Sequence, residues 1–132
     1  MLVKSAAYAC MIVVLTIPSM VNAADCKSIL AKLPKHDPQT NTQVQMVQNF
    51  EKQCQERSDA SDPQAHKQCI AAGMRGMAVA GNFIAAERMA RIECEAGNNT
   101  ISLNWMAMVI NNLNATEADR DAAQEAINAK DQ

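Results

Sequence analysis

The amino-acid sequence predicts an all-α fold, a small bundle of five or six helices stapled by two disulfides. Apolar residues after position 23 recur at intervals of three and four, which is the spacing of one face of a helix. No stretch in that part of the chain alternates apolar and polar residues as a half-buried strand would. Cysteines after position 23 number four, an even count typical of structural bridges in a small exported chain.

The first 23 residues have the pattern of a secretory signal peptide. Lys4 supplies the positive charge, an apolar run extends from 6 to 17, and Val21-Asn22-Ala23 is a small-x-small cleavage site. The apolar run is shorter than the ~20 residues that span a bilayer. We therefore expect cleavage after Ala23, a single helical domain over 24–132, export of that domain, and no membrane attachment after cleavage.

The composition after the expected cleavage site is acidic and poor in aromatic side chains. Removal of Lys4 leaves 11 of the 12 basic residues against 14 acidic ones, a net charge of −3, which argues against a nucleic-acid-binding protein. The aromatic residues are Phe50, Phe83 and Trp105, so small and aliphatic side chains must supply most of the core. In a core this thin, the disulfides are expected to contribute much of the stability.

Helix-start signals divide the N-terminal part of the chain. Asp25 can cap a short first helix, and Pro34 closes it because proline cannot continue a helix. Thr40 and Gln43 have the spacing of a capping box, which predicts the start of a second helix.

The segment 69–81 is predicted to be the central helix, around which the rest of the chain is organised. Asp62 followed by Pro63 marks its start, since aspartate is a good cap and proline a good first helical residue. Gly73 and Gly76 each cost ~1 kcal/mol relative to alanine inside a helix. The favoured interpretation of their face is close packing of a neighbouring helix, and the alternative is a shallow contact patch that includes the adjacent methionines.

The four cysteines after the signal peptide allow three disulfide connectivities. Cys54 near the end of one helix and Cys69 early in the next flank a short turn, so an antiparallel hairpin would bring them together. We predict this pairing, which leaves Cys26 with Cys94. No Cys-x-x-Cys is present, which disfavours a zinc ribbon or a thioredoxin-like redox pair.

Glycine and asparagine punctuate the next part of the chain. Gly81-Asn82 is a break or a kink, and a helix follows over 83–95. Gly97-Asn98-Asn99 ends that helix by supplying the left-handed positions that a C-cap needs. Thr100 or Ser102 is expected to start the next helix.

The last predicted helix is amphipathic but weakly apolar. Thr116 and Asp119 frame its start, and it continues to about Ala129. Its predicted apolar face consists of Ala118, Ala122 and Ala126, with Ile127 beside them.

The titratable side chains form no recognisable catalytic pattern. His36 and His66 belong to no His-Glu-x-x-His helix and are interpreted as surface histidines. Asp119 and Asp121 are two residues apart, so on a helix they point away from each other and are interpreted as solvated. Glu87 is likewise assigned to the solvent side of its helix. We expect no catalytic site, no cofactor and no metal site.

The order of cysteines, glycines and helices resembles that of a known family. A helix ending in Cys54 is followed by about a dozen polar residues and by Cys69, which opens the glycine-containing helix. Cys94, a Gly-Asn-Asn-Thr turn and an apolar helix come next, and Thr100 lies six residues after Cys94. Over about residues 48–128 this pattern resembles the small periplasmic immunity proteins that accompany type VI secretion peptidoglycan amidase effectors.

The resemblance implies a function and a partner. It implies an immunity protein that is no enzyme, forms a homodimer, and sterically inhibits a cell-wall amidase by blocking its active-site cleft. The candidate contact residues lie in two loops beside the expected bridges and on the small-residue helix: Ser58, Asp59, Asp62, Gly97, Asn98, Asn99, Met74 and Arg75. The alternative is a periplasmic helical chaperone or small-ligand-binding protein, because a Met/Ala-rich core with few aromatics could open and expose apolar faces.

Overall fold

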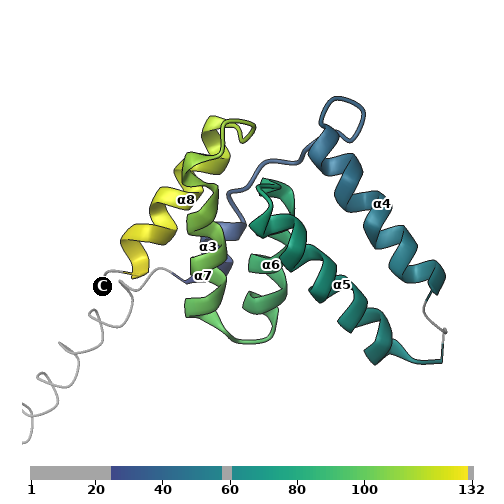
Figure 1. Ribbon diagram of the computed structural model, residues 1–132. Coiled ribbons are helices and arrows are strands. Elements are labelled where there is room, and N and C mark those ends of the chain that lie inside the picture. The colour runs from purple at the N-terminus through teal and green to yellow at the C-terminus, as the bar shows by residue number, and fades with distance from the viewer. Residues whose placement is uncertain (1–24, 58–60, 131–132) are drawn as a thin grey trace, which may run out of the picture.

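A computed structural model of the protein describes residues 25–57 and 61–130 and has the all-α fold that the sequence predicts (Figure 1). The described residues contain helices and no strand. The helices are α3 (Cys26–Leu30), α4 (Thr42–Arg57), α5 (Pro63–Val79), α6 (Phe83–Glu95), α7 (Asn99–Ala107), the 3-10 helix η1 (Met108–Asn111) and α8 (Glu117–Lys130). No helix among them is both long and apolar enough to cross a membrane. The predicted signal peptide, residues 1–23, lies outside the described part of the chain.

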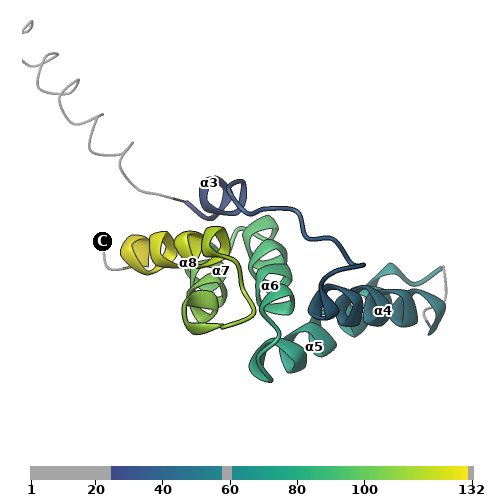
Figure 2. The ribbon, with the colours of Figure 1, turned by 90° about the horizontal axis from the view of Figure 1, so that it is seen from above.

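Helix α6 lies at the centre of the fold, which corrects the prediction that the segment 69–81 is central. It packs against α3, α4, α5, α7 and η1 (Figures 1 and 2). Its buried side chains surround most of its circumference, whereas α5 buries only Met74 and Ala78. The small alanine side chains of α6 allow neighbouring helices to approach from several sides. Because alanine is only weakly apolar, the sequence of this helix did not indicate how much of it would be buried.

Side-chain caps fix three helix starts as predicted. The carboxylates of Asp25 and Asp62 each accept a hydrogen bond from the backbone N–H three residues further on, at 2.9 and 3.1 Å. At the start of α8, Thr116 N–H donates to Asp119 Oδ2 at 3.0 Å, and Asp119 N–H donates to Thr116 Oγ1 at 3.3 Å. This reciprocal pair is a capping box and confirms the predicted frame of the last helix.

The capping box predicted at Thr40 is wrong by one residue. Helix α4 begins at Thr42, and Asn41 Oδ1 accepts hydrogen bonds from the first two N–H groups that follow Thr42. In the predicted capping box the Gln43 side chain would accept a hydrogen bond from the backbone N–H of Thr40, and among the described residues it does not. Its Oε1 accepts a hydrogen bond from Phe83 N–H at 2.9 Å and so joins the start of α4 to the start of α6.

Two glycines end helices in the left-handed backbone region. Gly81 has φ +104° and separates α5 from α6, so Gly81-Asn82 is a break. Gly97 has φ +85° and ends α6 as predicted. Helix α7 begins at Asn99, one residue before the predicted Thr100. Ser102 is buried inside α7, where its hydroxyl donates to the Ala90 carbonyl at 2.6 Å.

Both predicted disulfides are present. Cys54–Cys69 joins α4 to α5, and Cys26–Cys94 joins α3 to α6, with Cα–Cα distances of 5.7 and 5.8 Å. Disulfides of this kind are typical of oxidising environments such as those that exported proteins meet.

The core forms two clusters that meet at α6. The hairpin cluster gathers buried side chains of α4, α5 and the first half of α6, joined by Val109, Ala115 and Ala123 from η1 to α8. Val47, Met74 and Phe83 are among its fully buried members. The body cluster gathers α3, the second half of α6, α7 and α8, and it contains the Cys26–Cys94 bridge. Trp105 packs against both clusters, as expected for a core tryptophan.

The small-residue face of α5 packs closely at one glycine and is open at the other. A Cβ on Gly73 would lie 1.8 Å from Cζ of Phe50. The absence of a side chain at Gly73 therefore lets the Phe50 ring of α4 pack directly against α5. A Cβ on Gly76 would meet no atom within 4 Å. The close-packing interpretation is therefore confirmed for Gly73 only.

Candidate functional site

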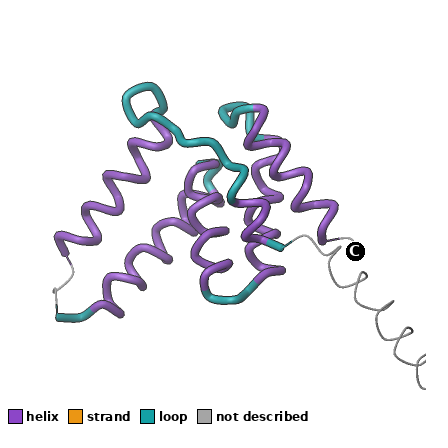
Figure 3. Tube along the Cα trace, turned by 180° about the vertical axis from the view of Figure 1, so that it is seen from behind, coloured by secondary structure: helices purple, strands orange, loops and turns teal. Residues whose placement is uncertain are grey.

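The described parts of the two loops that carry most of the predicted contact residues lie along one edge of the molecule and are set apart along it (Figures 1 and 3). Ser58 and Asp59 lie outside the described residues, and Asp62 is exposed where α5 begins beside them. The turn 97–99 joins α6 to α7 at the lower edge of Figure 1. Helix α5 begins at the lower edge of the same view. The fold therefore places both loops where one partner could reach them.

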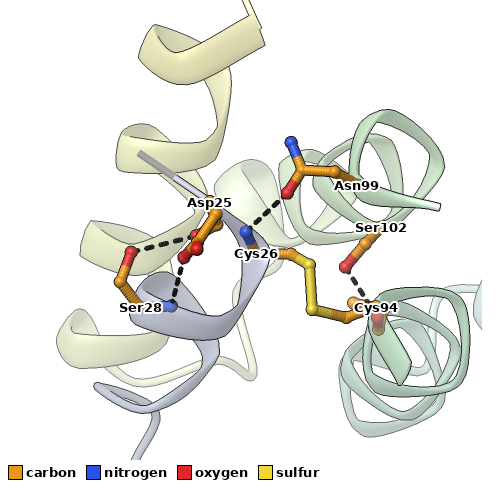
Figure 4. The surroundings of a disulfide bond; sticks show 7 residues. Asp25, Cys26, Ser28, Cys94, Asn99 and Ser102 are labelled. Atoms are coloured by element: carbon orange, nitrogen blue, oxygen red, sulfur yellow. Dashed lines mark hydrogen bonds between the residues drawn. A yellow bond between two sulfur atoms is a disulfide. The ribbon is translucent and has the colours of Figure 1, made fainter. Parts of the chain in front are cut away.

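The asparagines of the 97–99 turn have structural roles of their own. Asn99 Oδ1 accepts a hydrogen bond from Cys26 N–H at 2.7 Å, and Figure 4 shows this bond beside the Cys26–Cys94 bridge. Asn98 Nδ2 donates to Glu93 Oε2 at 2.9 Å. This turn is thus fixed to α3 and α6.

The two predicted contacts on α5 divide between core and surface. Met74 is 0% exposed and belongs to the hairpin cluster, so as a surface contact its prediction is wrong. Arg75, the next residue, is exposed. Met74 follows the i, i+4 spacing from the buried face at Ile70 to Ala78, which is why it points inward.

A groove lies between these loops. We call it the hairpin groove; it has a volume of about 1030 Å³ and is bounded by the last turns of α4, the first turns of α5 and the end of α6. Its lining combines apolar surface with side chains of both charges: Gln48, Glu51, Lys52, Gln55, Gln64, His66, Lys67, Gln68, Ile70, Ala71, Ile92, Glu95 and Ala96. Mixed charge on a concave surface suits a protein partner with a polar contact surface.

The part of the hairpin beside the groove has almost no core of its own. We call residues 51–57 and 63–71 the distal hairpin; Cys54 is the one side chain in these two ranges that is fully buried. Among the described helices, α4 makes close backbone contacts with α5 and α6 alone. The Cys54–Cys69 bridge therefore holds together a segment that packing alone holds weakly.

A second site is a buried network that the sequence interpretation missed. His36 Nε2 lies 3.0 Å from Asp119 Oδ1, and the edge of the His36 ring packs against Phe83. Asp119 also accepts a hydrogen bond from the Thr116 hydroxyl at 2.6 Å. Glu87 and Asp119 are 5% and 0% exposed, so the prediction that both are solvated is wrong, as is that of a surface His36.

In this buried network the pKa of Glu87 is raised and the pKa of Asp119 is lowered. Desolvation, together with a hydrogen bond to Asp119, raises the pKa of Glu87 to about 10. Desolvation by itself raises the pKa of Asp119, but hydrogen bonds from Glu87, Thr116 and His36 outweigh it and leave that pKa lowered. At neutral pH Glu87 therefore carries a proton that it shares with an ionised Asp119.

The network acts as a structural tie between three segments. His36 belongs to the connection between α3 and α4, Glu87 to α6 and Asp119 to α8. One ring nitrogen of His36 and one carboxylate oxygen from each of Glu87 and Asp119 lie within 4.8 Å of one another, close enough for a metal ion. The 3.0 Å contact between His36 and Asp119 is the length of a hydrogen bond, so the arrangement as it stands is a hydrogen-bonded network.

The helical period contains the signal that would have found this network. Glu87 follows Phe83 by four residues and precedes Ala90 by three, so it occupies a position on the apolar stripe of α6. Asp119 precedes Ala122 by three residues and Ala123 by four, and both alanines are buried on α8. The buried face of α8 therefore begins at Asp119, and the predicted Ala118 is exposed.

Comparison of the chain with protein-family models, with curated proteins and with solved structures gives no significant match.

Proposed function

We propose that the chain is an exported immunity protein that binds a cell-wall amidase effector and blocks its active-site cleft, with no catalytic activity of its own. The observation that supports this proposal is the disulfide-stapled distal hairpin, which extends from the body and carries little core (Figure 1). The distal hairpin contributes little to the hydrophobic core, yet a disulfide fixes its conformation. We take this to mean that the conformation serves a purpose other than stability. Binding is such a purpose, because an ordered loop loses less entropy when a partner engages it.

The proposed contact surface is the hairpin groove together with the two loops at its rims. Lys52, Lys67, Glu51 and Glu95 offer both charges along the groove, so that a complementary partner could be distinguished from others. The turn at Asn98 is held at a fixed distance from the distal hairpin by α6 and by its own hydrogen bond to that helix. The partner would therefore meet a preformed rim at this turn. In this arrangement inhibition is steric and needs no chemistry from the protein.

The compartment is part of the same proposal. Two disulfides suit an oxidising environment. Cleavage of residues 1–23 as a signal peptide would deliver the domain to the periplasm, where a peptidoglycan amidase acts.

The direct test is inhibition of purified peptidoglycan amidases encoded beside the gene for this chain. The chain from Ala24 onward is added at increasing ratio while the release of peptide from peptidoglycan is measured. We expect inhibition that saturates at a fixed stoichiometry. Lys67→Glu in the hairpin groove should weaken inhibition by at least ~10-fold, the loss expected when a contact becomes a like-charge clash.

The control is Lys130→Glu, which reverses an equally exposed charge at the far end of α8. It should leave inhibition unchanged. Equal loss in both variants, or full inhibition by Lys67→Glu, would overturn the placement of the surface. If the immobilised chain binds many unfolded proteins from an extract and no cell-wall hydrolase, that result would instead support the chaperone alternative.

A further inference from the structure

A second cavity lies beside the hairpin groove and shares Gln48 with it. We call it the side cavity; it has a volume of about 520 Å³ and is lined by residues of α3, of the connection between α3 and α4, of α4 and of α6. Small-molecule sites in proteins have volumes of about 300–1,000 Å³. The side cavity is therefore large enough for a small organic ligand.

The charged side chains that line the side cavity are mainly cationic. They are Lys35, Arg88 and Arg91, and Glu87 is the one carboxyl among the lining residues. Glu87 does not balance them, because burial and its hydrogen bond to Asp119 keep its pKa raised and the group protonated at neutral pH. The cavity thus presents an excess of positive charge.

Arg88 is not neutralised by the ion pair that it makes outside the cavity. Its Nη2 lies 3.6 Å from Glu51 Oε1, and both side chains are more than a third exposed, so this pair is weak. Its Nε is buried and has no hydrogen-bond partner in the described structure. Oε2 of the neighbouring Glu87 is likewise buried and unpaired. Both atoms are closed to solvent, so a ligand in the cavity must pair with the Nη groups of Arg88.

Much of the rest of the cavity wall is apolar, with His36 and Gln48 as its polar members. Leu30, Leu33 and Pro34 line it from the α3 side, and Val44 and Ile84 line it from α4 and α6. Apolar walls with a few convergent polar groups are the usual make-up of a small-molecule site. The apolar part selects a hydrocarbon body, and the arginines select an anionic group.

We propose that the side cavity binds a small organic carboxylate with an apolar body, whose carboxylate pairs with the Arg88 guanidinium. Carboxylate is favoured because the two Nη groups of the planar guanidinium form a fork that matches its two oxygens. Arg91 and Lys35 add to the attraction for the anion. This inference stands apart from amidase inhibition, since the cavity shares with the hairpin groove only Gln48, at its margin.

The test uses octanoate as the probe, with octan-1-ol and octylamine as neutral and cationic counterparts of equal chain length. Isothermal titration of the chain from Ala24 onward should give one octanoate per chain. Octan-1-ol should bind at least ~10-fold more weakly, the effect of losing one charge-assisted hydrogen bond. Octylamine should bind more weakly still, since its charge is repelled. Methyl resonances of Val44 and Ile84 should shift with octanoate if the ligand lies in this cavity.

Substitutions at Arg88 then locate the carboxylate. Arg88→Met keeps much of the side-chain volume and should lower octanoate affinity by at least ~10-fold. Arg88→Lys keeps the charge without the fork and should give an intermediate affinity. Arg75→Met, at an exposed arginine of α5 that does not line the cavity, is the matched control and should bind octanoate like the wild type.

Several results would overturn the proposal. Equal binding of octanoate and octan-1-ol by the wild type would show an unselective apolar surface. Unchanged octanoate affinity in a folded Arg88→Met would remove the assigned role of Arg88. No saturable binding up to ~1 mM, a limit that corresponds to about −4 kcal/mol, would exclude the site. The comparison of probes on the wild type decides the question even if a variant fails to fold.

Discussion

The distal hairpin and the body are both closed by a disulfide, but the two bridges are placed in opposite surroundings. Cys26–Cys94 lies inside the body cluster, among side chains of α3, α6, α7 and α8. Cys54–Cys69 joins two helical segments that bury almost nothing else. The first bridge therefore strengthens a core that already exists, and the second replaces a core that is missing.

This difference indicates which part of the molecule is available for binding. Residues needed for the core cannot easily serve a partner, whereas the distal hairpin is polar on its surface and leaves its side chains exposed. A cross-link costs few residues and fixes the backbone. The disulfide thus orders the distal hairpin while most of its surface side chains stay available for a partner, which suits the proposed inhibitory contact.

The largest expected effect is the loss of the body bridge. Cys26 and Cys94 are separated by 68 residues, and the chain-entropy model gives about 4 kcal/mol for closing a loop of this size. We expect Cys26→Ser/Cys94→Ser to lower the free energy of unfolding by about this amount. Urea titration followed by helical circular dichroism and by Trp105 fluorescence should show one common transition at lower urea. A decrease below ~1 kcal/mol would mean that packing alone fixes α3.

Loss of the hairpin bridge should be smaller and local. The 15-residue separation of Cys54 and Cys69 corresponds to about 3 kcal/mol in the same model. We expect Cys54→Ser/Cys69→Ser to speed amide exchange in 51–57 and 63–71 while α6 and α7 stay protected. Hydrogen exchange read by mass spectrometry distinguishes this from global unfolding. Unchanged protection of the distal hairpin would contradict the contrast between the two bridges.

The third prediction concerns the buried carboxyl pair of the body. The unfolded chain loses the Glu87 proton above about pH 4.5, whereas the folded protein keeps it until about pH 10. Between these values the folded state binds more protons, so stability falls as pH rises, by up to ~1.4 kcal/mol per pH unit. Asp119, with its lowered pKa, acts in the opposite sense and contributes stability that is lost in acid, below its ordinary pKa of 3.8.

Glu87→Gln tests this account because glutamine imitates the protonated carboxyl. The variant should be more stable than the wild type at pH 7 by about 2 kcal/mol, within the ~3 kcal/mol that the distance from the ordinary pKa allows. Its stability should also depend less on pH between 5 and 9. Glu56→Gln, an exposed carboxyl in the distal hairpin, should keep the wild-type slope. A wild-type slope in Glu87→Gln would show that another group carries the dependence.

The same contrast explains what the sequence could and could not predict. Helix starts at Asp25 and Asp62 and the breaks at Gly81 and Gly97 depend on neighbouring residues alone, so local rules found them. The Cys54–Cys69 pairing followed from two helices joined by a short turn. Local rules succeed where the cause of the structure is local.

The body was harder to predict because its causes are long-range. Glu87 and Asp119 look like solvent residues until α6 and α8 are brought together with the His36 segment. Alanines made α6 appear a weaker core element than α5, although they are what lets so many helices pack around it. The hairpin groove and the side cavity likewise depend on the angle between elements, which periodicity does not fix.

The smallest predicted effect separates the two glycines of α5, one at the base of the hairpin and one on its open face. Gly73→Ala must displace the Phe50 ring from the hairpin cluster, and we expect a net loss of about 1 kcal/mol after the gain in helix propensity. Gly76→Ala meets open space and should gain up to ~1 kcal/mol. Urea unfolding of the two single variants gives both values. If Gly73→Ala is as stabilising as Gly76→Ala, the Phe50 ring has left without cost, and the contact of α4 with α5 at this point contributes little to holding the hairpin on the body.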